Sequence, residues 1–254
     1  MLDIIATTKN KRYKYIKSLK QKKIRDVECV FTVEGRKSVN DAISSNCEII
    51  LIAVSESYYN EFGGYIQDTV IVKDELFQGL CDTKTPQGVI AVIKKNDVKN
   101  FIPKNKLYIY CDNIQDPGNL GTIIRTAEAA GLGAVFLSPD CVDVYNPKTV
   151  RSSMGSFFNI PKIIDYSYND LFTLKQDGFK LVCGALEEDS VPYTSIDFTK
   201  PTVIVIGNES NGVSNDILRE CLHIIIPIYG KAESLNAAVA ASIMMYEARR
   251  QQEE

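Results

Sequence analysis

The second half of the chain alternates short apolar runs with helix-type segments, and this alternation limits the folds that it can adopt. The apolar runs are "KLYIYC", "AVFLS", "KLVCGAL", "TVIVIG" and "HIIIPI". Apolar strands separated by helices are typical of a mostly parallel sheet that is covered on both faces. We therefore predict an α/β fold, in which ligands bind at the carboxyl ends of the strands.

The first hundred residues predict a second, smaller α/β domain. The runs "CVFTVEG" and "EIILIAVS" predict strands, "RKSVNDAISS" predicts the helix between them, and "TVIV" and "GVIAVI" predict two more short strands. Residues 94–106 are polar and aperiodic, which is typical of a linker. The expected organisation is a domain over residues 1–97, a linker over 98–105 and a domain over 106–254.

Composition narrows the function classes. With 254 residues, of which 45% are hydrophobic, the chain can bury a core. Its start lacks the pattern of a secretory signal, and no run approaches 18 apolar residues, so we expect a cytoplasmic protein with no membrane partner. The seven cysteines are scattered without a C-x-x-C pair, so we expect neither a disulfide framework nor a metal site. The one histidine, His223, is expected to be structural.

A strongly basic segment runs from Lys9 to Arg25 and contains no acidic residue. One interpretation is the solvated face of a helix, and the other is a surface that follows a phosphate backbone. The composition of the segment leaves both open. Its nine basic residues are Lys9, Lys11, Arg12, Lys14, Lys17, Lys20, Lys22, Lys23 and Arg25.

The first of three polar turns is "QDPGNLGTIIR", residues 115–125. Pro-Gly indicates a turn, and Asn119 is expected to cap the helix that follows. Helical spacing places Arg125 above Gly121 and Thr122, away from the buried face. An arginine over small residues leaves room for a large ligand.

The second turn, "VIVIGNESNGVS", leaves a buried strand at Gly207 and places Glu209 at its carboxyl end. A glycine there lets a ligand approach the backbone closely. The chain lacks G-x-G-x-x-G, and "GNESNG" is not followed by Lys and Ser or Thr, so neither a dinucleotide site nor a nucleoside triphosphate loop is expected.

The third turn, "IPIYGKAESLNAAVAAS", bends at Gly230 and enters a helix with Ser234 or Asn236 near its cap. The alanines that follow are small, so another chain segment or another subunit is expected to pack closely on them.

Together, "NLGTIIRTAEAAG", "IGNESNGVS" and "IPIYGKAESLNAAVAAS" resemble the three signature motifs of the SpoU (TrmH-type) RNA 2′-O-ribose methyltransferases of the SPOUT superfamily. The resemblance covers essentially the whole chain. The segments "FTVEGRKSV" and "TKTPQGVIAV" resemble the substrate-binding domain, of the ribosomal-protein type, that precedes the catalytic domain in many members.

The resemblance implies a deep trefoil knot in the C-terminal domain, S-adenosylmethionine as cofactor, and a homodimer through the knot region. It also implies that the segment from Ile228 to Ser234 closes over the cofactor. The positions expected to meet the cofactor are Gly207, Ile226, Ile228 and Leu235.

The resemblance also implies catalytic roles. Arg125 is expected to contact the ribose 2′-oxygen and the neighbouring phosphate, while whether it also removes the proton stays open, because guanidinium normally remains protonated. Glu209 is expected to orient Arg125 through a charge-assisted hydrogen bond. The other polar motif positions are Asn119, Ser234 and Asn236.

Large-subunit ribosomal RNA is the favoured substrate. One alternative is an enzyme that methylates tRNA ribose, and another is a non-catalytic RNA-binding protein of the same fold. The residues expected to bind RNA are Lys9, Lys11, Arg12, Arg36, Arg151 and Ser153.

Overall fold

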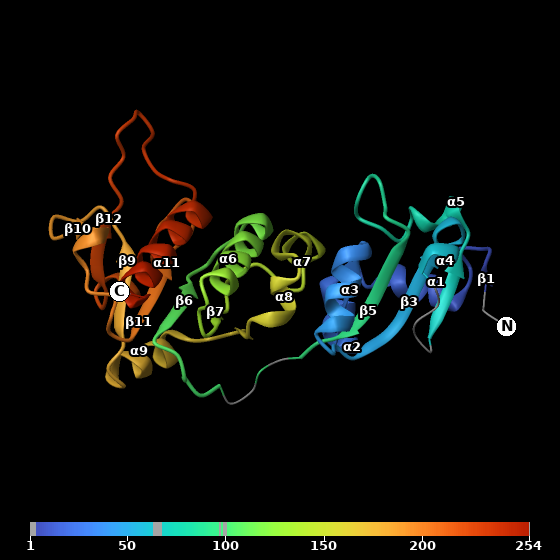
Figure 1. Cartoon of the computed structure of the whole chain (residues 1–254), viewed down its shortest axis with the longest axis horizontal. Coiled ribbons are helices and arrows are strands. Elements are labelled where there is room, and N and C mark those ends of the chain that lie inside the picture. The colour runs from blue at the N-terminus through green and yellow to red at the C-terminus, as the bar shows by residue number, and fades with distance from the viewer. Residues whose placement is uncertain (1–3, 63–67, 97, 99–100, 254) are drawn as a thin grey trace. The chain divides into compact units, whose positions relative to one another are not determined.

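The computed structural model describes residues 4–62, 68–96, 98 and 101–253 (Figure 1). Residue 97, the last of the expected first domain, and residues 99 and 100, in the expected linker, lie outside the described residues. The chain divides into two compact units: unit 1 comprises residues 1–96 and 145–158, and unit 2 comprises residues 97–144 and 159–254.

Unit 1 contains a five-stranded mixed sheet in the order β1-β4-β3-β5-β2. The pairs β1–β4 and β4–β3 are parallel, whereas β5 is antiparallel to both of its neighbours. Its strands are β1 (Ile4–Ile5), β2 (Val30–Glu34), β3 (Ile49–Ser55), β4 (Thr69–Val72) and β5 (Val89–Lys94). Its helices are α1 (Lys11–Ser18), α2 (Lys22–Glu28), α3 (Arg36–Ser44), α4 (Glu56–Phe62), α5 (Asp74–Phe77), α7 (Pro147–Ser153) and α8 (Ser156–Asn159), of which only the last residue is assigned to unit 2.

The segment 145–158 belongs to unit 1 although the sequence places it between two strands of unit 2. Phe31 on β2 is the centre of this packing: its ring centroid lies 4.9 Å from that of Tyr145 and 5.4 Å from that of Phe157. Aromatic rings at these distances bury large apolar areas. An aromatic cluster therefore attaches α7 to the sheet of unit 1.

Unit 2 contains a seven-stranded sheet in the order β10-β12-β9-β11-β6-β7-β8, and all of its described pairings are parallel. This confirms the predicted α/β class. Its strands are β6 (Leu107–Cys111), β7 (Val135–Leu137), β8 (Lys162–Ile163), β9 (Lys180–Gly184), β10 (Val191–Pro192), β11 (Thr202–Ile206) and β12 (Leu222–Ile225). Its helical segments are α6 (Pro117–Ala129), α9 (Tyr168–Gln176), η1 (Tyr193–Ser195), α10 (Asn215–Leu218) and α11 (Ala237–Glu253).

The central strands β6 and β11 are buried along their whole length, which explains why they read as continuous apolar runs. Their carboxyl ends lie at the same edge of the sheet, since Ile206 pairs with Cys111 in a parallel register. The turns that follow these strands are therefore neighbours in space. No helix in the described part of the chain is both long and apolar enough to cross a bilayer.

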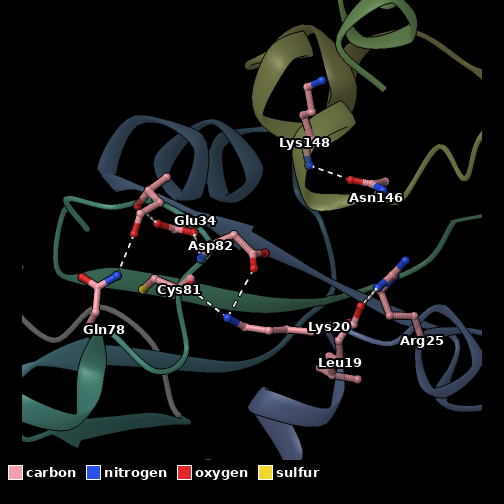
Figure 2. Close-up of polar contacts among 10 residues, drawn as sticks. Leu19, Lys20, Arg25, Glu34, Gln78, Cys81, Asp82, Asn146 and Lys148 are labelled. Atoms are coloured by element: carbon pink, nitrogen blue, oxygen red, sulfur yellow. Dashed lines mark hydrogen bonds and ion pairs between the residues drawn. The ribbon is translucent and has the colours of Figure 1, made fainter. Parts of the chain in front are cut away.

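The basic segment forms two helices, α1 and α2, with a break at Leu19–Gln21. Arg25 is not on a solvated face, because it is only 2% exposed and its Nη1 donates to the carbonyl oxygens of Leu19 (2.8 Å) and Lys20 (2.9 Å), as Figure 2 shows. Carbonyl groups at the end of a helix lack intrahelical donors. Arg25 therefore stabilises the break instead of facing a ligand.

We expect Arg25→Met to lower the free energy of unfolding of unit 1 by about 2–3 kcal/mol, because two carbonyl groups next to a buried position lose their donor. Urea unfolding followed by circular dichroism measures the change. Lys23→Met, at an exposed position on the same helix, is the matched control and should stay within about 0.5 kcal/mol of the parent chain. Equal losses in the two variants would contradict this role of Arg25.

Candidate active site at the carboxyl edge of the parallel sheet

The first turn leaves β6 and enters α6, and Asp116 caps that helix. The side chain of Asp116 accepts a hydrogen bond from the backbone N–H of Asn119 at 2.9 Å, and Pro117 occupies the first helical position. The prediction that Asn119 is the cap is wrong. Proline favours the first position of a helix, which makes the preceding residue the cap. The side chain of Asn119 is consequently available for other contacts.

A chain of hydrogen bonds joins the three polar turns. Asn236 Nδ2 donates to Asn119 Oδ1 at 2.9 Å, and Asn119 Nδ2 donates to Glu209 Oε1 at 2.9 Å. In the sequence, Asn119 precedes Glu209 by 90 positions and Asn236 by 117 positions. An ionised carboxylate only accepts, so it suits the end of a chain of amide donors. The three turns thus meet at one point.

Asn236 also begins α11, as the third turn predicted. Its Oδ1 accepts from the backbone N–H of Ala238 (2.9 Å) and Val239 (3.3 Å), which is the hydrogen-bonding pattern of a helix cap. One amide group therefore caps a helix with its oxygen and reaches the first turn with its nitrogen.

The second turn starts at Gly207, where the surrounding backbone leaves no room for a side chain. A Cβ atom on Gly207 would lie 2.2 Å from the backbone carbon of Gly212 and 2.2 Å from the nitrogen of Val213. Asn208 holds the rest of the turn: its Oδ1 accepts from the N–H of Ser210 (2.9 Å), and its Nδ2 donates to the carbonyl of Asn113 (2.9 Å). The second turn is thereby fixed to the first.

Glu209 is held by donors from the first turn. Besides Asn119, the backbone N–H groups of Gln115 and Asp116 lie 3.4 Å from its carboxylate oxygens. Burial by itself would raise the pKa of Glu209, but the hydrogen bonds from Asn119 and the backbone outweigh it and lower the pKa below its ordinary value. Glu209 is therefore ionised at neutral pH.

The side chain of Arg125 is exposed on α6 and forms no hydrogen bond or ion pair with any residue that the structure describes. The expected contact with Glu209 is not made, because that carboxylate is taken up by Asn119 and two backbone N–H groups. Arg125 shares a face of α6 with Gly118 and Thr122, seven and three residues before it. Its guanidinium group is thus free to meet a ligand.

The segment between β12 and α11 extends away from the rest of unit 2 as an open loop (Figure 1). Ile226 is half-buried, whereas Ile228, Ser234 and Leu235 are exposed. Within the described part of the chain, the backbone N–H groups of residues 228–235 donate no hydrogen bond. This loop therefore offers apolar side chains and free backbone groups directly after β12, a strand that is only partly buried.

Asp112 is a residue that the motifs did not single out. It is 1% exposed and follows β6 directly; its Oδ2 accepts from the backbone N–H of Ser214 at 2.7 Å, and its Oδ1 accepts from the hydroxyl of Tyr168 at 3.2 Å. It thus fixes the far end of the second turn to β6. An acid directly after an apolar strand is the sequence signal that could have found it.

The residues expected to bind RNA lie in unit 1 and differ in their availability. Lys9, Lys11, Arg12 and Arg151 are exposed. Ser153 is buried, and its hydroxyl donates to the carbonyl of Val150 at 2.9 Å, so it cannot reach a phosphate in this conformation.

Arg36 is exposed but already engaged. Its Nη1 lies 2.8 Å from a carboxylate oxygen of Glu61, and its guanidinium carbon lies 3.6 Å from the centroid of the Tyr58 ring. A phosphate would have to compete with these contacts.

His223 lies away from the three turns and has structural partners. Its Nδ1 lies 2.7 Å from a carboxylate oxygen of Asp189, and its Nε2 lies 2.8 Å from the carbonyl oxygen of Leu218. Both partners are acceptors, so the doubly protonated ring is favoured, and the pKa of His223 is raised, first by Asp189 and then by the carbonyl.

Comparison with known proteins identifies two families along the chain. Residues 106–246 match the SpoU rRNA Methylase family, and residues 10–91 match the MRM3-like substrate binding domain. The chain is 37% identical over 248 residues to the 23S rRNA (guanosine(2553)-2′-O)-methyltransferase RlmP of Bacillus subtilis. The aligned region covers 96% of this chain and 98% of that protein.

Two solved structures have the same fold over nearly the whole chain. An AdoMet-bound rRNA methyltransferase from Sinorhizobium meliloti is 32% identical, covers 98% of each chain and gives a TM-score of 0.87. The SpoU methyltransferase AviRb from Streptomyces viridochromogenes, in complex with AdoMet, is 29% identical, covers 96% of this chain and 98% of its own, and gives a TM-score of 0.86.

We expect Glu209→Gln to loosen the junction of the turns, because a neutral amide is a weaker acceptor for Asn119 and the backbone N–H groups of Gln115 and Asp116. Amide hydrogen exchange at Gln115 and Asp116 should become about tenfold faster. Glu188→Gln, at an exposed position of the same unit, is the control.

The same loosening should follow acidification. Because the folded pKa of Glu209 is lowered, its stabilising effect is present above the unfolded pKa and is lost as the pH falls through the folded pKa. Exchange that stays unchanged in Glu209→Gln would show that the carboxylate does not hold the junction.

Proposed function

Because the chain belongs to the SpoU rRNA methylase family, we propose that it transfers a methyl group from S-adenosylmethionine to a ribose 2′-hydroxyl of large-subunit ribosomal RNA. The observation that carries the proposal is the hydrogen-bonded chain Asn236–Asn119–Glu209, which brings the three motifs together beside a free arginine. Under this proposal residues 1–97 bind RNA, residues 106–254 carry out the transfer, and the protein acts in the cytoplasm.

The residues at the sheet edge fit the cofactor. Gly207 brings bare backbone to the end of β11, and a side chain there would collide with the turn itself. Ile226 and Leu235 offer apolar surface to an adenine, and the free backbone N–H groups of residues 228–235 can bind its polar edge. When bound, S-adenosylmethionine supplies a methyl group on a sulfonium, which is already a good leaving centre.

The chain's own residues position the hydroxyl that is methylated. Arg125 contacts the 2′-oxygen and the neighbouring phosphate, since guanidinium stays charged and donates up to five hydrogen bonds. Glu209 is a poor base at neutral pH because its pKa is lowered, and a general base works best with a pKa near the working pH. We therefore give Glu209, Asn119 and Asn236 the task of holding the turns around the ribose. Ser234 lies in the exposed loop, where it can meet either ligand.

We further propose a homodimer through the region of the open loop and α11. Exposed apolar side chains gather there, namely Ile228, Tyr229, Leu235, Val239 and Tyr246. Tyr229 is 97% exposed, which is costly for so large a ring unless a partner covers it. The trefoil knot implied for the segment from β11 to α11 stays a prediction, which an experimental structure traced through residues 226–236 checks.

We expect Arg125→Ala to reduce methyl transfer at least a hundredfold, about the loss found when one donor to a transition state is removed. Cofactor affinity, measured by calorimetry, should change less than about twofold, because the cofactor contacts lie on other turns. Arg219→Ala, at an exposed position of unit 2, is the matched control and should keep full activity. Lost cofactor binding with methylation intact would reverse the assignment.

The RNA is identified by comparing ribose methylation in ribosomal and transfer RNA from cells with and without this protein. A single site lost from large-subunit RNA is expected. A change confined to tRNA would contradict the proposed substrate.

Light scattering at micromolar concentration should give twice the mass of the 28.3 kDa chain. Tyr229→Ser with Ile228→Ser should shift the protein toward the monomer, because both exposed apolar side chains are removed. A monomeric mass for the parent chain at this concentration would contradict the dimer.

A further inference from the structure

The position of Arg125 depends on α6 alone. Its side chain has no hydrogen bond or ion pair within the described part of the chain, so only the helix backbone places its guanidinium group. The buried side chains of Leu120, Ile124 and Ala127 attach α6 to the core. Hydrophobic contacts are non-directional, whereas hydrogen bonds fix direction. The residues that bond to α6 from outside the helix therefore also place Arg125.

The C-terminal helix α11 contacts α6 at three levels. The two helices lie side by side in unit 2 (Figure 1). At their starts Asn236 donates to Asn119, and halfway along them the hydroxyl oxygens of Ser242 and Thr126 lie 3.3 Å apart. At the other end of α6 the contact is made by Arg249, which is half-buried. The helix that carries Arg125 is thus held at both ends by one neighbour.

Arg249 binds the C-terminal end of α6 with two donors. Its Nε donates to the carbonyl oxygen of Ala130 at 2.7 Å, and its Nη2 donates to that of Gly131 at 2.8 Å. Carbonyl groups at the end of a helix lack donors and carry partial negative charge. The last turn of α6 contains no basic residue of its own. Arg249 therefore supplies from α11 both the donors and the positive charge that this end of α6 requires.

The end of α6 is shaped to admit this guanidinium group. Gly131 has a φ of +68°, and a Cβ atom there would lie 2.8 Å from Nη2 of Arg249. The N–H of Gly131 donates to the carbonyl of Glu128, and the N–H of Leu132 donates to that of Ala127, both at 2.9 Å, which is the Schellman pattern. Two bonds from a rigid planar group fix orientation as well as distance.

We propose that Arg249 is a positioning residue for methyl transfer and acts through α6 on Arg125. Arg125 lies about 9 Å along the helix axis from Asn119. Without the contact at Ala130 and Gly131, α6 would pivot at Asn119, where a tilt of roughly 6° moves Arg125 by about 1 Å. A misplacement of about 1 Å can cost roughly a hundredfold in rate. The inference rests on the proposed function, since that function assigns Arg125 to the reaction.

The first test is Arg249→Met, which keeps the length of the side chain and removes its donors. Single-turnover methyl transfer at saturating RNA and S-adenosylmethionine should become about tenfold slower, less than the full cost of misplacement because the buried face of α6 limits its movement. Calorimetry gives the fraction of chains that bind the cofactor, and the rate is divided by this fraction so that unfolded protein does not count as slow enzyme. Arg249→Lys, which keeps the charge, should lie between the parent chain and Arg249→Met.

A double-mutant cycle separates positioning from a merely structural role. In the Arg125→Ala chain, Arg249→Met should change the remaining rate by less than about twofold, because the group that it positions is gone. A tenfold loss in both backgrounds, or no loss in either, would overturn the inference. If Arg249→Met does not fold, Arg249→Lys completes the same cycle.

Arg250→Ala is the matched control, because it removes the next arginine of α11, which pairs with Glu247 on the same helix at 2.9 Å. It should leave the rate unchanged. A second measurement is independent of activity: the NMR signal of the Arg125 backbone amide should shift in Arg249→Met and stay in place in Arg250→Ala.

The two measurements keep this inference apart from the proposed function. A parent chain that methylates RNA but shows the same loss in both backgrounds would keep the function and remove the role of Arg249. A parent chain that methylates no RNA would contradict the function, and the amide signal would still test whether Arg249 places Arg125. A signal that does not move in Arg249→Met would overturn the inference.

Discussion

The ionised carboxylate of Glu209 is the contact on which the candidate active site depends. It receives one side-chain and two backbone donors from the first turn, and the amide of Asn119 passes the connection on to Asn236 and α11. Three segments that are far apart in sequence are thus fixed by polar groups at the rim of a buried sheet. Because the acceptor stays ionised at neutral pH, the junction is complete before any ligand arrives.

The backbone beneath this junction is prepared by the parallel pairing of β6 and β11. Asp112 and Asn113 follow β6 and hold both ends of the second turn, through the N–H of Ser214 and the side chain of Asn208. Gly207 starts that turn, and a side chain at this position would collide with the backbone of Gly212 and Val213. Rigid surroundings of this kind let a few weak contacts position a reacting group accurately.

Much of this arrangement was predictable from the sequence, because strand periodicity and turn residues are local signals. The strands β2 to β7, β9, β11 and β12 and the position of Asn236 at a helix cap follow from such signals. The two-residue strands β1, β8 and β10 are too short to leave a pattern. The contact between Glu209 and Arg125 was expected from the family resemblance. The carboxylate is bound instead by Asn119 and by two backbone N–H groups, and backbone donors cannot be identified from the sequence. Ser153 was predicted to bind RNA at the surface, but its side chain is buried.

The buried position of Arg25 also changes how the basic segment can act on RNA. Of its nine basic residues, Arg25 is internal and Lys20 is tied to Asp82 and Cys81, which leaves seven exposed cations on and beside α1 and α2. A cation that contacts a phosphate of a single strand releases roughly 0.7 counterion. The logarithm of the affinity that this segment contributes can therefore fall with the logarithm of salt concentration by a slope of about 5 at most. A steeper measured slope would require cations elsewhere on the chain to touch the RNA.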